Sequence, residues 1–282
     1  MKNVLIIGAG VMGLGITQIV AQNGFNVMLK DINTEIVKQG IEKIENRLRK
    51  LNVKGKIDSQ ELTNCLHRIN IYQKEENKFE PDLVIEAVSE NIDLKRKVIS
   101  EIEEFCSKDT IIASNTTSLS ITKLSTVLKK PEQFIGMHFF NPVWAMNLIE
   151  IIPGILTSAA TIKNAQEFCS KIDKTSVLVK ESAGGIVSRI LGSLINEAIF
   201  VYAEGIASAE DIDTAMKLGA NLPIGPLHLV DLIGLDIHLA KMESFYHEYG
   251  ETKYRVHPLL RKMVRGGLLG KKTGKGFFEY AQ

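Results

Sequence analysis

The chain has 282 residues, with 34 Lys and Arg against 33 Asp and Glu. This balance gives no long-range basic field, so we expect no nucleic-acid partner. The 3 cysteines are far apart and lack C-x-x-C spacing, which argues against a disulfide framework or a metal site and favours a reducing, cytoplasmic location. We also expect no signal peptide and no membrane partner, because no apolar run has the length of a bilayer span.

Short apolar runs alternate with helical patterns as far as Lys180. Strands are predicted over residues 4–7, 26–30, 82–88, 110–113, 134–138, 147–152 and 176–179, and those over 4–7, 82–88, 110–113 and 134–138 are expected to be buried. Helices are predicted over residues 12–23, 35–56, 93–105 and 163–171. Such alternation predicts an α/β fold with a doubly wound, mostly parallel sheet of the Rossmann type.

The pattern changes after Lys180, where helical signals continue with almost no strand pattern. We therefore expect two domains, residues 1–184 containing the sheet and residues 185–282 forming an all-helical C-terminal domain. The segment from Ile186 to Tyr202 is apolar on nearly every face. Such a segment is either an internal core helix or part of a dimer interface, and the sequence leaves both interpretations open.

A glycine pattern, G-x-G-x-x-G, stands at Gly8, Gly10 and Gly13 between the first predicted strand and the first predicted helix. Glycines at these places allow a tight turn, close approach of the backbone to a pyrophosphate, and packing of the helix on the strand. Asp31 ends the next predicted strand, 18 residues beyond Gly13. A carboxylate there accepts hydrogen bonds from both ribose hydroxyls of an adenosine and repels a 2′-phosphate. The pattern predicts NAD as the cofactor, and the alternative is a structural turn with an incidental aspartate.

Polar side chains follow the predicted strands at their carboxyl ends, where ligands bind in such sheets. They are Glu90 and Lys95 after the strand over 82–88, Ser114, Asn115 and Thr117 after the strand over 110–113, and His138 and Asn141 at the end of the strand over 134–138. Glu86 and Glu150 are carboxylates inside otherwise apolar runs, and a buried charge requires a partner.

A pair between His138 and Glu150 would fix the tautomer of the imidazole. The ring would then be a candidate for the base that takes the hydroxyl proton when a secondary alcohol is oxidised. The alternative is a histidine of the core that serves no catalytic purpose.

The chain resembles the L-3-hydroxyacyl-CoA dehydrogenase family, in particular its bacterial 3-hydroxybutyryl-CoA dehydrogenases, over essentially its whole length. The motifs that carry the resemblance stand in the family's order and include GAGVMGLGI, DLVIEAVSEN, IIASNTTSLSIT, IGMHFFNPV, EDIDTAMKLGANLPIGPL and GKKTGKGFFEY. The resemblance implies a Rossmann-type NAD domain, a helical domain that forms a homodimer, and an active site between the two.

The resemblance also assigns roles to individual residues. The family's catalytic His–Glu pair falls on His138 and Glu150, and its coenzyme A contact falls on Lys54. Its cofactor contacts fall on Asp31, Glu90, Lys95, Asn141 and Lys272, which join Gly8, Gly10, Met12, Gly13 and Asn115 in the expected cofactor set.

Several positions depart from the family's pattern. Thr117 stands in place of a catalytic serine that also binds substrate, and keeps the hydroxyl. Ser188 stands in place of an assisting asparagine, and Gly185 in place of a phenylalanine. Trp144 stands where the family usually has proline. These changes predict a reshaped acyl pocket, an altered substrate or impaired turnover.

The leading hypothesis is an NAD-dependent enzyme of fatty acid or butanoate metabolism that interconverts (S)-3-hydroxyacyl-CoA and 3-ketoacyl-CoA. A chain of four carbons is favoured because Trp144 adds bulk near the expected acyl end. One alternative is the same reaction on a free 3-hydroxy acid. Another is a weakly catalytic protein that binds NAD and acyl-CoA, because Thr117 and Ser188 depart from the pattern while the cofactor motifs are intact.

Overall fold

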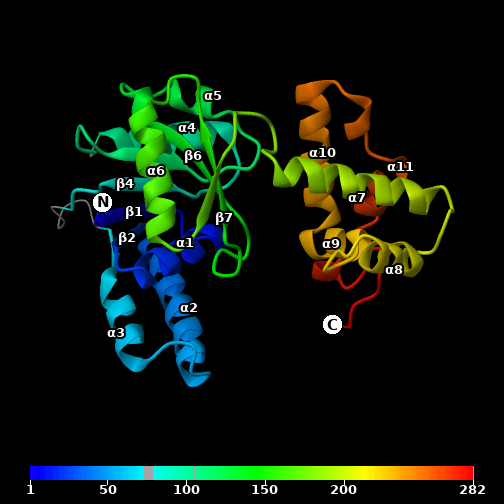
Figure 1. The fold of residues 1–282 in the computed structure, drawn as a ribbon, viewed down its shortest axis with the longest axis horizontal. Coiled ribbons are helices and arrows are strands. Elements are labelled where there is room, and N and C mark those ends of the chain that lie inside the picture. The colour runs from blue at the N-terminus through cyan, green and yellow to red at the C-terminus, as the bar shows by residue number, and fades with distance from the viewer. Residues whose placement is uncertain (73–78, 105, 282) are drawn as a thin grey trace. The chain divides into compact units, whose positions relative to one another are not determined.

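A computed structural model describes residues 1–72, 79–104 and 106–281. The chain divides into two compact units, Met1–Ser182 and Ala183–Gln282, and each has a hydrophobic core of its own (Figure 1). The division falls two residues before the boundary expected at Gly184.

The first unit is built on an 8-stranded sheet with the order β3-β2-β1-β4-β5-β6-β7-β8. The strands are β1 (Asn3–Ile7), β2 (Asn26–Lys30), β3 (Ile69–Ile71), β4 (Leu83–Glu86), β5 (Ile111–Ser114), β6 (Phe134–Phe139), β7 (Leu148–Pro153) and β8 (Thr175–Leu178). Neighbouring strands are parallel except for β6 and β7, which are antiparallel. The predicted doubly wound, mostly parallel sheet is therefore confirmed.

Helices cover both faces of this sheet (Figure 1). They are α1 (Val11–Gln22), α2 (Thr34–Val53), α3 (Ser59–Arg68), α4 (Ile92–Glu103), α5 (Ile121–Ser125) and α6 (Ala159–Lys171), with a 3-10 turn η1 (Pro131–Gln133). Side chains of α1, α2, α3 and α6 join one buried cluster, and those of α4 and α5 join another. In β1, Val4 and Ile6 belong to the first cluster, while Leu5 and Ile7 belong to the second. Alternate residues point to opposite faces, so a strand covered on both sides requires a continuous apolar run.

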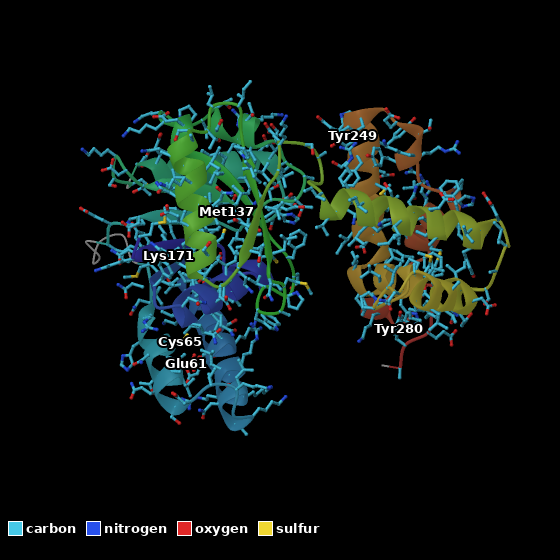
Figure 2. The ribbon with its side chains drawn as sticks, in the orientation of Figure 1. Glu61, Cys65, Met137, Lys171, Tyr249 and Tyr280 are labelled. Atoms are coloured by element: carbon cyan, nitrogen blue, oxygen red, sulfur yellow. The ribbon has the colours of Figure 1, made fainter. Side chains whose placement is uncertain are left out.

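The central strands are buried along their whole length. Every residue of β4, β5 and β6 is buried. Met137 of β6, labelled in Figure 2, belongs to the same buried cluster as Phe168 and Cys169 of α6. Polar groups of these strands are therefore best placed for chemistry at the strand ends, where the helices do not cover them.

The second unit consists of helices around a separate apolar core. They are α7 (Val187–Ala203), α8 (Ala209–Gly219), α9 (Pro226–Ile233), α10 (Leu235–Tyr249) and α11 (Pro258–Arg265), with 3-10 turns η2 (Thr252–Tyr254) and η3 (Lys271–Thr273). Asp231 of α9 accepts hydrogen bonds from the backbone of Phe277 at 3.0 Å and Phe278 at 2.9 Å, and from the Tyr280 hydroxyl at 3.0 Å. These bonds tie the end of the chain to the helices (Figure 2). The predicted all-helical C-terminal domain is confirmed.

Helix α7 is the segment that is apolar on nearly every face. Ile195 and Ile199 are fully buried in the core of the second unit, so one face of the helix is a core face. Ile190, however, is 63% exposed. The helix thus serves the core and also leaves apolar surface uncovered.

Short elements are where the sequence prediction was incomplete. Helix α3, strand β3 and helix α5 were not predicted, and the helix predicted over 93–105 ends at Glu103, with residue 105 lying outside the described residues. A signal for α3 was present, because Asp58 caps the helix by accepting a hydrogen bond from the backbone of Glu61 at 2.7 Å. Within the part of the chain that the structure describes, no helix combines the length and apolar character needed to cross a membrane.

Candidate active site at the carboxyl ends of the strands

The glycine-rich loop joins β1 to α1. Gly8 has φ of +108°, and a Cβ atom there would lie 2.6 Å from the Ala87 backbone oxygen. At Gly13 a Cβ would lie 1.8 Å from the Gly8 oxygen, so this glycine lets α1 pack on the loop. At Gly10 a Cβ would meet nothing within 4 Å. Gly10 is also the N-cap residue of α1, and no side chain accepts a hydrogen bond from the first backbone N–H groups of this helix. A helix N-terminus without such a cap presents its free N–H groups to an anion.

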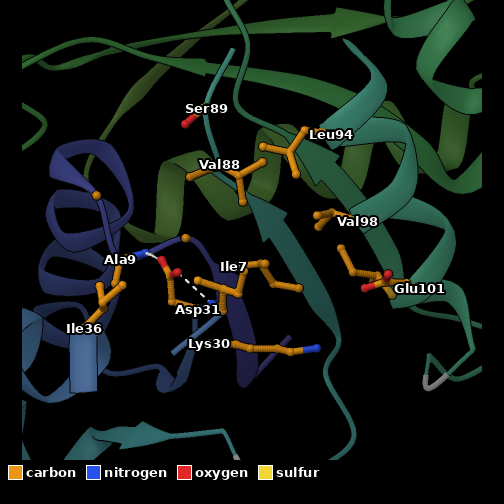
Figure 3. Close-up of a pocket in the computed structure, with 15 residues that line it drawn as sticks. Ile7, Ala9, Lys30, Asp31, Ile36, Val88, Ser89, Leu94, Val98 and Glu101 are labelled. Atoms are coloured by element: carbon orange, nitrogen blue, oxygen red, sulfur yellow. Dashed lines mark hydrogen bonds between the residues drawn. The ribbon is translucent and has the colours of Figure 1, made fainter. Parts of the chain in front are cut away.

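A pocket of about 490 Å³ lies beside this loop (Figure 3). Gly8, Gly10 and Asp31 line it, together with apolar side chains that include Val88, Leu94 and Val98. The Asp31 carboxylate accepts hydrogen bonds from the backbone of Ala9 at 2.6 Å and Ile32 at 2.7 Å, which hold it against the loop. Glu101 and Lys30 also line the pocket, and Asp31 is the acidic group beside the glycine loop. A mostly apolar cleft with an open glycine backbone and a carboxylate beside it suits the adenosine and pyrophosphate of NAD, so the residues present fit this cofactor.

His138 and Glu150 form a buried pair across β6 and β7. The antiparallel register places the two residues directly opposite each other. His138 Nδ1 lies 2.9 Å from Glu150 Oε2, and the residues are 6% and 0% exposed. With Nδ1–H donating to the carboxylate, Nε2 keeps its lone pair as an acceptor. The hydroxyl Oγ1 of Thr117 lies 3.1 Å from Nε2 and donates to it in this tautomer.

Glu90 holds the turn that carries Thr117. Its Oε1 accepts hydrogen bonds from the Thr116 hydroxyl at 2.6 Å, from the backbone of Thr117 at 3.0 Å, and from the backbone and hydroxyl of Ser118 at 3.1 and 3.3 Å. Glu90 was expected only as a cofactor contact. Its hydrogen bonds also give it a part in fixing the Thr117 hydroxyl beside His138.

Asn115 and Asn141 follow the carboxyl ends of two neighbouring strands, β5 and β6. Asn115 follows β5, and its Oδ1 accepts a hydrogen bond from the backbone of Phe139, the last residue of β6, at 3.0 Å. Asn141 is exposed and follows β6 by two residues. Asn115 therefore joins the ends of two neighbouring strands, and Asn141 leaves its side chain in contact with solvent.

Lys95 occupies an unexpected position for a residue assigned to cofactor binding. Its side chain is 0% exposed and forms an ion pair with Glu86, with Nζ 2.7 Å from Oε1. Burial raises the pKa of the Glu86 carboxyl above its ordinary value, while the charge of Lys95 and its hydrogen bond oppose that rise. The partner that the buried Glu86 required is thus Lys95.

Lys54 and Trp144 are both associated with α2. Lys54 is the exposed C-cap residue of that helix. The indole ring of Trp144 lies under the Arg47 guanidinium of α2, with the guanidinium carbon 3.7 Å from the ring centroid. The bulk of Trp144 is therefore packed against α2, so its contacts give no support to the argument that it narrows the acyl end. Arg47 was not singled out from the sequence, although it precedes Lys54 by 7 residues and so shares its side of the helix.

Three further expected residues belong to the second unit. Ser188 is the second residue of α7 and is half-buried. Gly185 has φ of +54°, in the left-handed region where a phenylalanine would be strained. Lys272 forms an ion pair with Asp236, with Nζ 2.6 and 2.7 Å from its two oxygens. The first unit alone brings together His138, Glu150 and Thr117, and these second-unit residues are placed only within their own unit.

The cysteines are poor nucleophiles in this fold. Cys65, Cys106 and Cys169 are free. Burial raises the pKa of Cys65 to about 11 and the pKa values of Cys106 and Cys169 to about 12. The thiolate, which is the reactive form, is therefore scarce at neutral pH.

Comparisons with known proteins agree with this geometry. Residues 3–182 match the family described as 3-hydroxyacyl-CoA dehydrogenase, NAD binding domain, and residues 184–280 match the 3-hydroxyacyl-CoA dehydrogenase, C-terminal domain. A 3-hydroxybutyryl-CoA dehydrogenase of Clostridioides difficile is 46% identical over 275 residues, covering 98% of this chain and 98% of that protein. The mitochondrial hydroxyacyl-coenzyme A dehydrogenase of Homo sapiens is 37% identical, covering 99% of this chain and 91% of that protein. The crystal structure of (S)-3-hydroxybutyryl-CoA dehydrogenase from Ralstonia eutropha matches with a TM-score of 0.97 and 45% identity, covering 100% of both chains.

Proposed function

Because the chain belongs to the 3-hydroxyacyl-CoA dehydrogenase family, we propose that it is an NAD-dependent oxidoreductase that interconverts (S)-3-hydroxyacyl-CoA and 3-ketoacyl-CoA. Several relatives named 3-hydroxybutyryl-CoA dehydrogenase favour a substrate of four carbons, and hence a place in fatty acid or butanoate metabolism. The observation that carries the proposal is the chain of contacts from Glu150 through His138 to the Thr117 hydroxyl. This chain of contacts and the glycine-rich loop both lie at the carboxyl ends of the parallel strands.

In the oxidative direction His138 acts as the base. Its Nε2 takes the proton of the substrate hydroxyl, and Glu150, 2.9 Å from Nδ1, stabilises the imidazolium that forms. NAD held by the residues proposed for it would supply the acceptor for the hydride of the alcohol carbon, and NADH would supply the hydride in the reverse direction. The Thr117 hydroxyl, 3.1 Å from Nε2, hydrogen-bonds the substrate oxygen as its charge develops. In reduction the imidazolium returns its proton to the same oxygen.

The residues proposed for the cofactor and for coenzyme A come from different parts of the chain. Gly8, Gly10, Met12, Gly13 and Asp31 are proposed to hold the adenosine and pyrophosphate, and Glu90, Lys95, Asn115, Asn141 and Lys272 to complete the cofactor site. Lys54 is proposed as a point charge for a phosphate of coenzyme A, which its exposure at the end of α2 permits. We further propose that residues 1–184 and 185–282 act as the cofactor domain and the substrate and dimerisation domain.

The direct test measures NADH consumption with acetoacetyl-CoA, longer 3-ketoacyl-CoA thioesters and free 3-keto acids. We expect turnover with the thioesters and highest kcat/KM for acetoacetyl-CoA. Turnover of the free acids alone, or of none of these substrates while NADH still binds, would contradict the proposal.

Charge reversal at Lys54 tests the coenzyme A contact. Lys54→Glu is expected to raise the KM for acetoacetyl-CoA while leaving the KM for NADH unchanged. The matched control is Lys38→Glu, because Lys38 is an exposed lysine 16 residues earlier on α2, about 160° around the helix. Equal effects of the two substitutions would indicate a general charge effect and refute the assigned contact.

Ser188→Asn tests whether the departure in the second unit attenuates the enzyme. Restoring the amide is expected to raise kcat for acetoacetyl-CoA, because an amide reaches further than a hydroxyl and offers both a donor and an acceptor. An unchanged or lower kcat would indicate that Ser188 is adapted to this active site.

A homodimer formed through the second unit is also proposed. Ile190 of α7, Leu232 of α9 and Ile237 of α10 are large apolar side chains that are 63%, 51% and 53% exposed. Analytical ultracentrifugation should give a dimer for the protein and a larger monomer fraction for Ile190→Glu. The free cysteines are compatible with the reducing cytoplasm, which we propose as the location.

A further inference from the structure

One side of helix α4 forms a wall of the pocket beside the glycine-rich loop. Leu94, Val98 and Glu101 all line that pocket, and their spacings of four and three residues place them on one side of the helix. Figure 3 shows Asp31 beside the loop and Glu101 well apart from it on α4. The wall that α4 contributes is therefore apolar over most of its length and carries a carboxylate toward the C-terminal end of the helix.

The Glu101 carboxylate serves no contact within the part of the chain that the structure describes. Its side chain is exposed, and it forms no hydrogen bond or ion pair with any of those residues. Glu103, two residues later, differs in this respect, because its Oε1 accepts hydrogen bonds from the backbone of Lys129 at 2.7 Å and Lys130 at 3.1 Å. Glu103 therefore holds a neighbouring loop, whereas Glu101 leaves its oxygen atoms available to a ligand of the pocket that it lines.

The loop side of the pocket determines which part of a dinucleotide faces α4. The open backbone at Gly10 suits the pyrophosphate, and the Asp31 carboxylate suits the ribose hydroxyls. The base is attached to that ribose, so it continues from Asp31 over the apolar side chains of the pocket. The polar edge of the base then needs a polar partner on the opposite wall.

Lys30 and Glu101 are the charged residues that line the pocket besides Asp31, and they would favour different bases. A carboxylate only accepts hydrogen bonds, so it favours the 6-amino group of adenine, whereas an ammonium only donates and favours a 6-oxo group. The Lys30 ammonium already lies over the Tyr72 ring, with Nζ 5.7 Å from the ring centroid. Glu101 is therefore the charged group that remains for the edge of the base.

We propose that Glu101 recognises the base of the cofactor, because its carboxylate accepts a hydrogen bond from the 6-amino group of adenine and so selects a 6-aminopurine dinucleotide over a 6-oxopurine one. This inference rests on NAD being the cofactor of the proposed function. It does not depend on which acyl substrate the enzyme uses.

Fluorescence titration with NADH and with deamino-NADH tests the contact directly. Deamino-NADH carries hypoxanthine, so an oxygen replaces the 6-amino group and would face the carboxylate. The N1–H of hypoxanthine would reach the carboxylate only if the base shifted along its edge. The parent protein should bind NADH at least about fivefold more tightly than deamino-NADH, because a hydrogen bond to a charged group is lost.

Substitution of Glu101 is expected to affect the two dinucleotides differently. Glu101→Ala should raise the Kd for NADH at least about threefold without raising the Kd for deamino-NADH, so that the two values come within about twofold of each other. Glu101→Gln should also bring them within about twofold, because its amide offers a donor as well as an acceptor. The side chain is exposed, so the Tm of both variants should stay within about 2 °C of the parent value.

Glu104→Gln is the matched control. Glu104 is the exposed C-cap residue of the same helix and lies outside the pocket, so this variant makes the same change of charge away from the base. It should keep the parent preference for NADH. Loss of the preference in Glu104→Gln would indicate a general charge effect and overturn the assigned contact.

Other results would also overturn the proposal. They are a smaller preference for NADH in the parent protein, an equal rise of both Kd values in Glu101→Ala, and a preference for deamino-NADH, which would assign the base to Lys30. A parent protein that does not bind NADH would overturn the cofactor assignment together with this inference. Selectivity that is lost in Glu101→Ala would support the inference even if no 3-ketoacyl-CoA is reduced, and only the proposed substrate would then be wrong.

Discussion

Gly13→Ala is predicted to lower the melting temperature, whereas Gly10→Ala is predicted to keep the melting temperature and to weaken NADH binding, although the two glycines belong to one turn. At Gly13 the added Cβ would lie 1.8 Å from the Gly8 oxygen, well below the 3.0 Å that real Cβ atoms respect. Helix α1 and the loop would have to separate by more than 1 Å, because the clashing atom is backbone and has no rotamer to change. At Gly10 the protein offers open space, and φ of −75° with ψ of −175° suits any residue.

The two changes differ in stability by several kcal/mol. Overpacking of this kind costs about 1–3 kcal/mol or more. For a domain of 150–250 residues, about 1 kcal/mol shifts Tm by roughly 2–4 °C, so Gly13→Ala should melt about 5–10 °C lower. Gly10→Ala should melt at the same temperature or slightly higher, because alanine reduces the entropy of the unfolded chain by about 0.4–1 kcal/mol. Its methyl group occupies the approach proposed for the pyrophosphate, so its Kd for NADH should rise at least about tenfold.

Thermal melting followed by circular dichroism and NADH titration followed by fluorescence measure the two effects independently. The reasoning would be refuted if Gly10→Ala kept the parent affinity for NADH, since the loop backbone would then not approach the cofactor. It would also be refuted if Gly13→Ala melted at the parent temperature, since the close packing of α1 on the loop would then be unimportant.

Three further predictions concern single groups. Glu150→Gln should lower kcat by about 10²–10⁴-fold with little change in the KM for acetoacetyl-CoA, because an amide cannot stabilise the His138 imidazolium; a kcat within threefold of the parent value would contradict this role. Thr117→Val should lower kcat by about 10²-fold and Thr117→Ser should keep it within about threefold, as stopped-flow reduction of acetoacetyl-CoA would show; equal losses would point to packing and not to the hydroxyl. Burial lowers the pKa of His238 from 6.5 to about 3, so as pH falls below 6.5 only the unfolded chain takes up this proton and stability is lost. The loss should reach about 2 kcal/mol at pH 5 and should be absent in His238→Leu, as urea unfolding at pH 7 and pH 5 would show.

The sheet and the glycine loop were predictable because their signals are local. A buried parallel strand requires a continuous apolar run, and the spacing of Gly8, Gly10 and Gly13 is visible without any tertiary contact. The His138–Glu150 pair was also predictable, since Glu150 interrupts an apolar run and lies only 12 residues beyond His138, within one hairpin.

The long-range contacts were not predictable in the same way. Lys95 stands in the charged stretch DLKRK, which by pattern alone indicates a solvent-facing helix surface, and only its position above the end of β4 explains its burial. The contact of Trp144 with Arg47 joins residues 97 positions apart, so nothing near either residue indicates it. Strand β3 has three residues, too few to show a periodic pattern.

The reversal of β7 is what supplies His138 with a carboxylate. His138 is the fifth of the six residues of β6, and Glu150 is the third of the six residues of β7. Antiparallel pairing in the observed register sets these two positions opposite each other, with both side chains on the same face of the sheet. A shift of one residue along β7 would turn Glu150 to the other face and leave a buried charge without its partner. The free-energy cost of that misplaced charge therefore favours the same register that the active site requires. The register that is most stable for the hairpin is thus also the one that pairs His138 with Glu150.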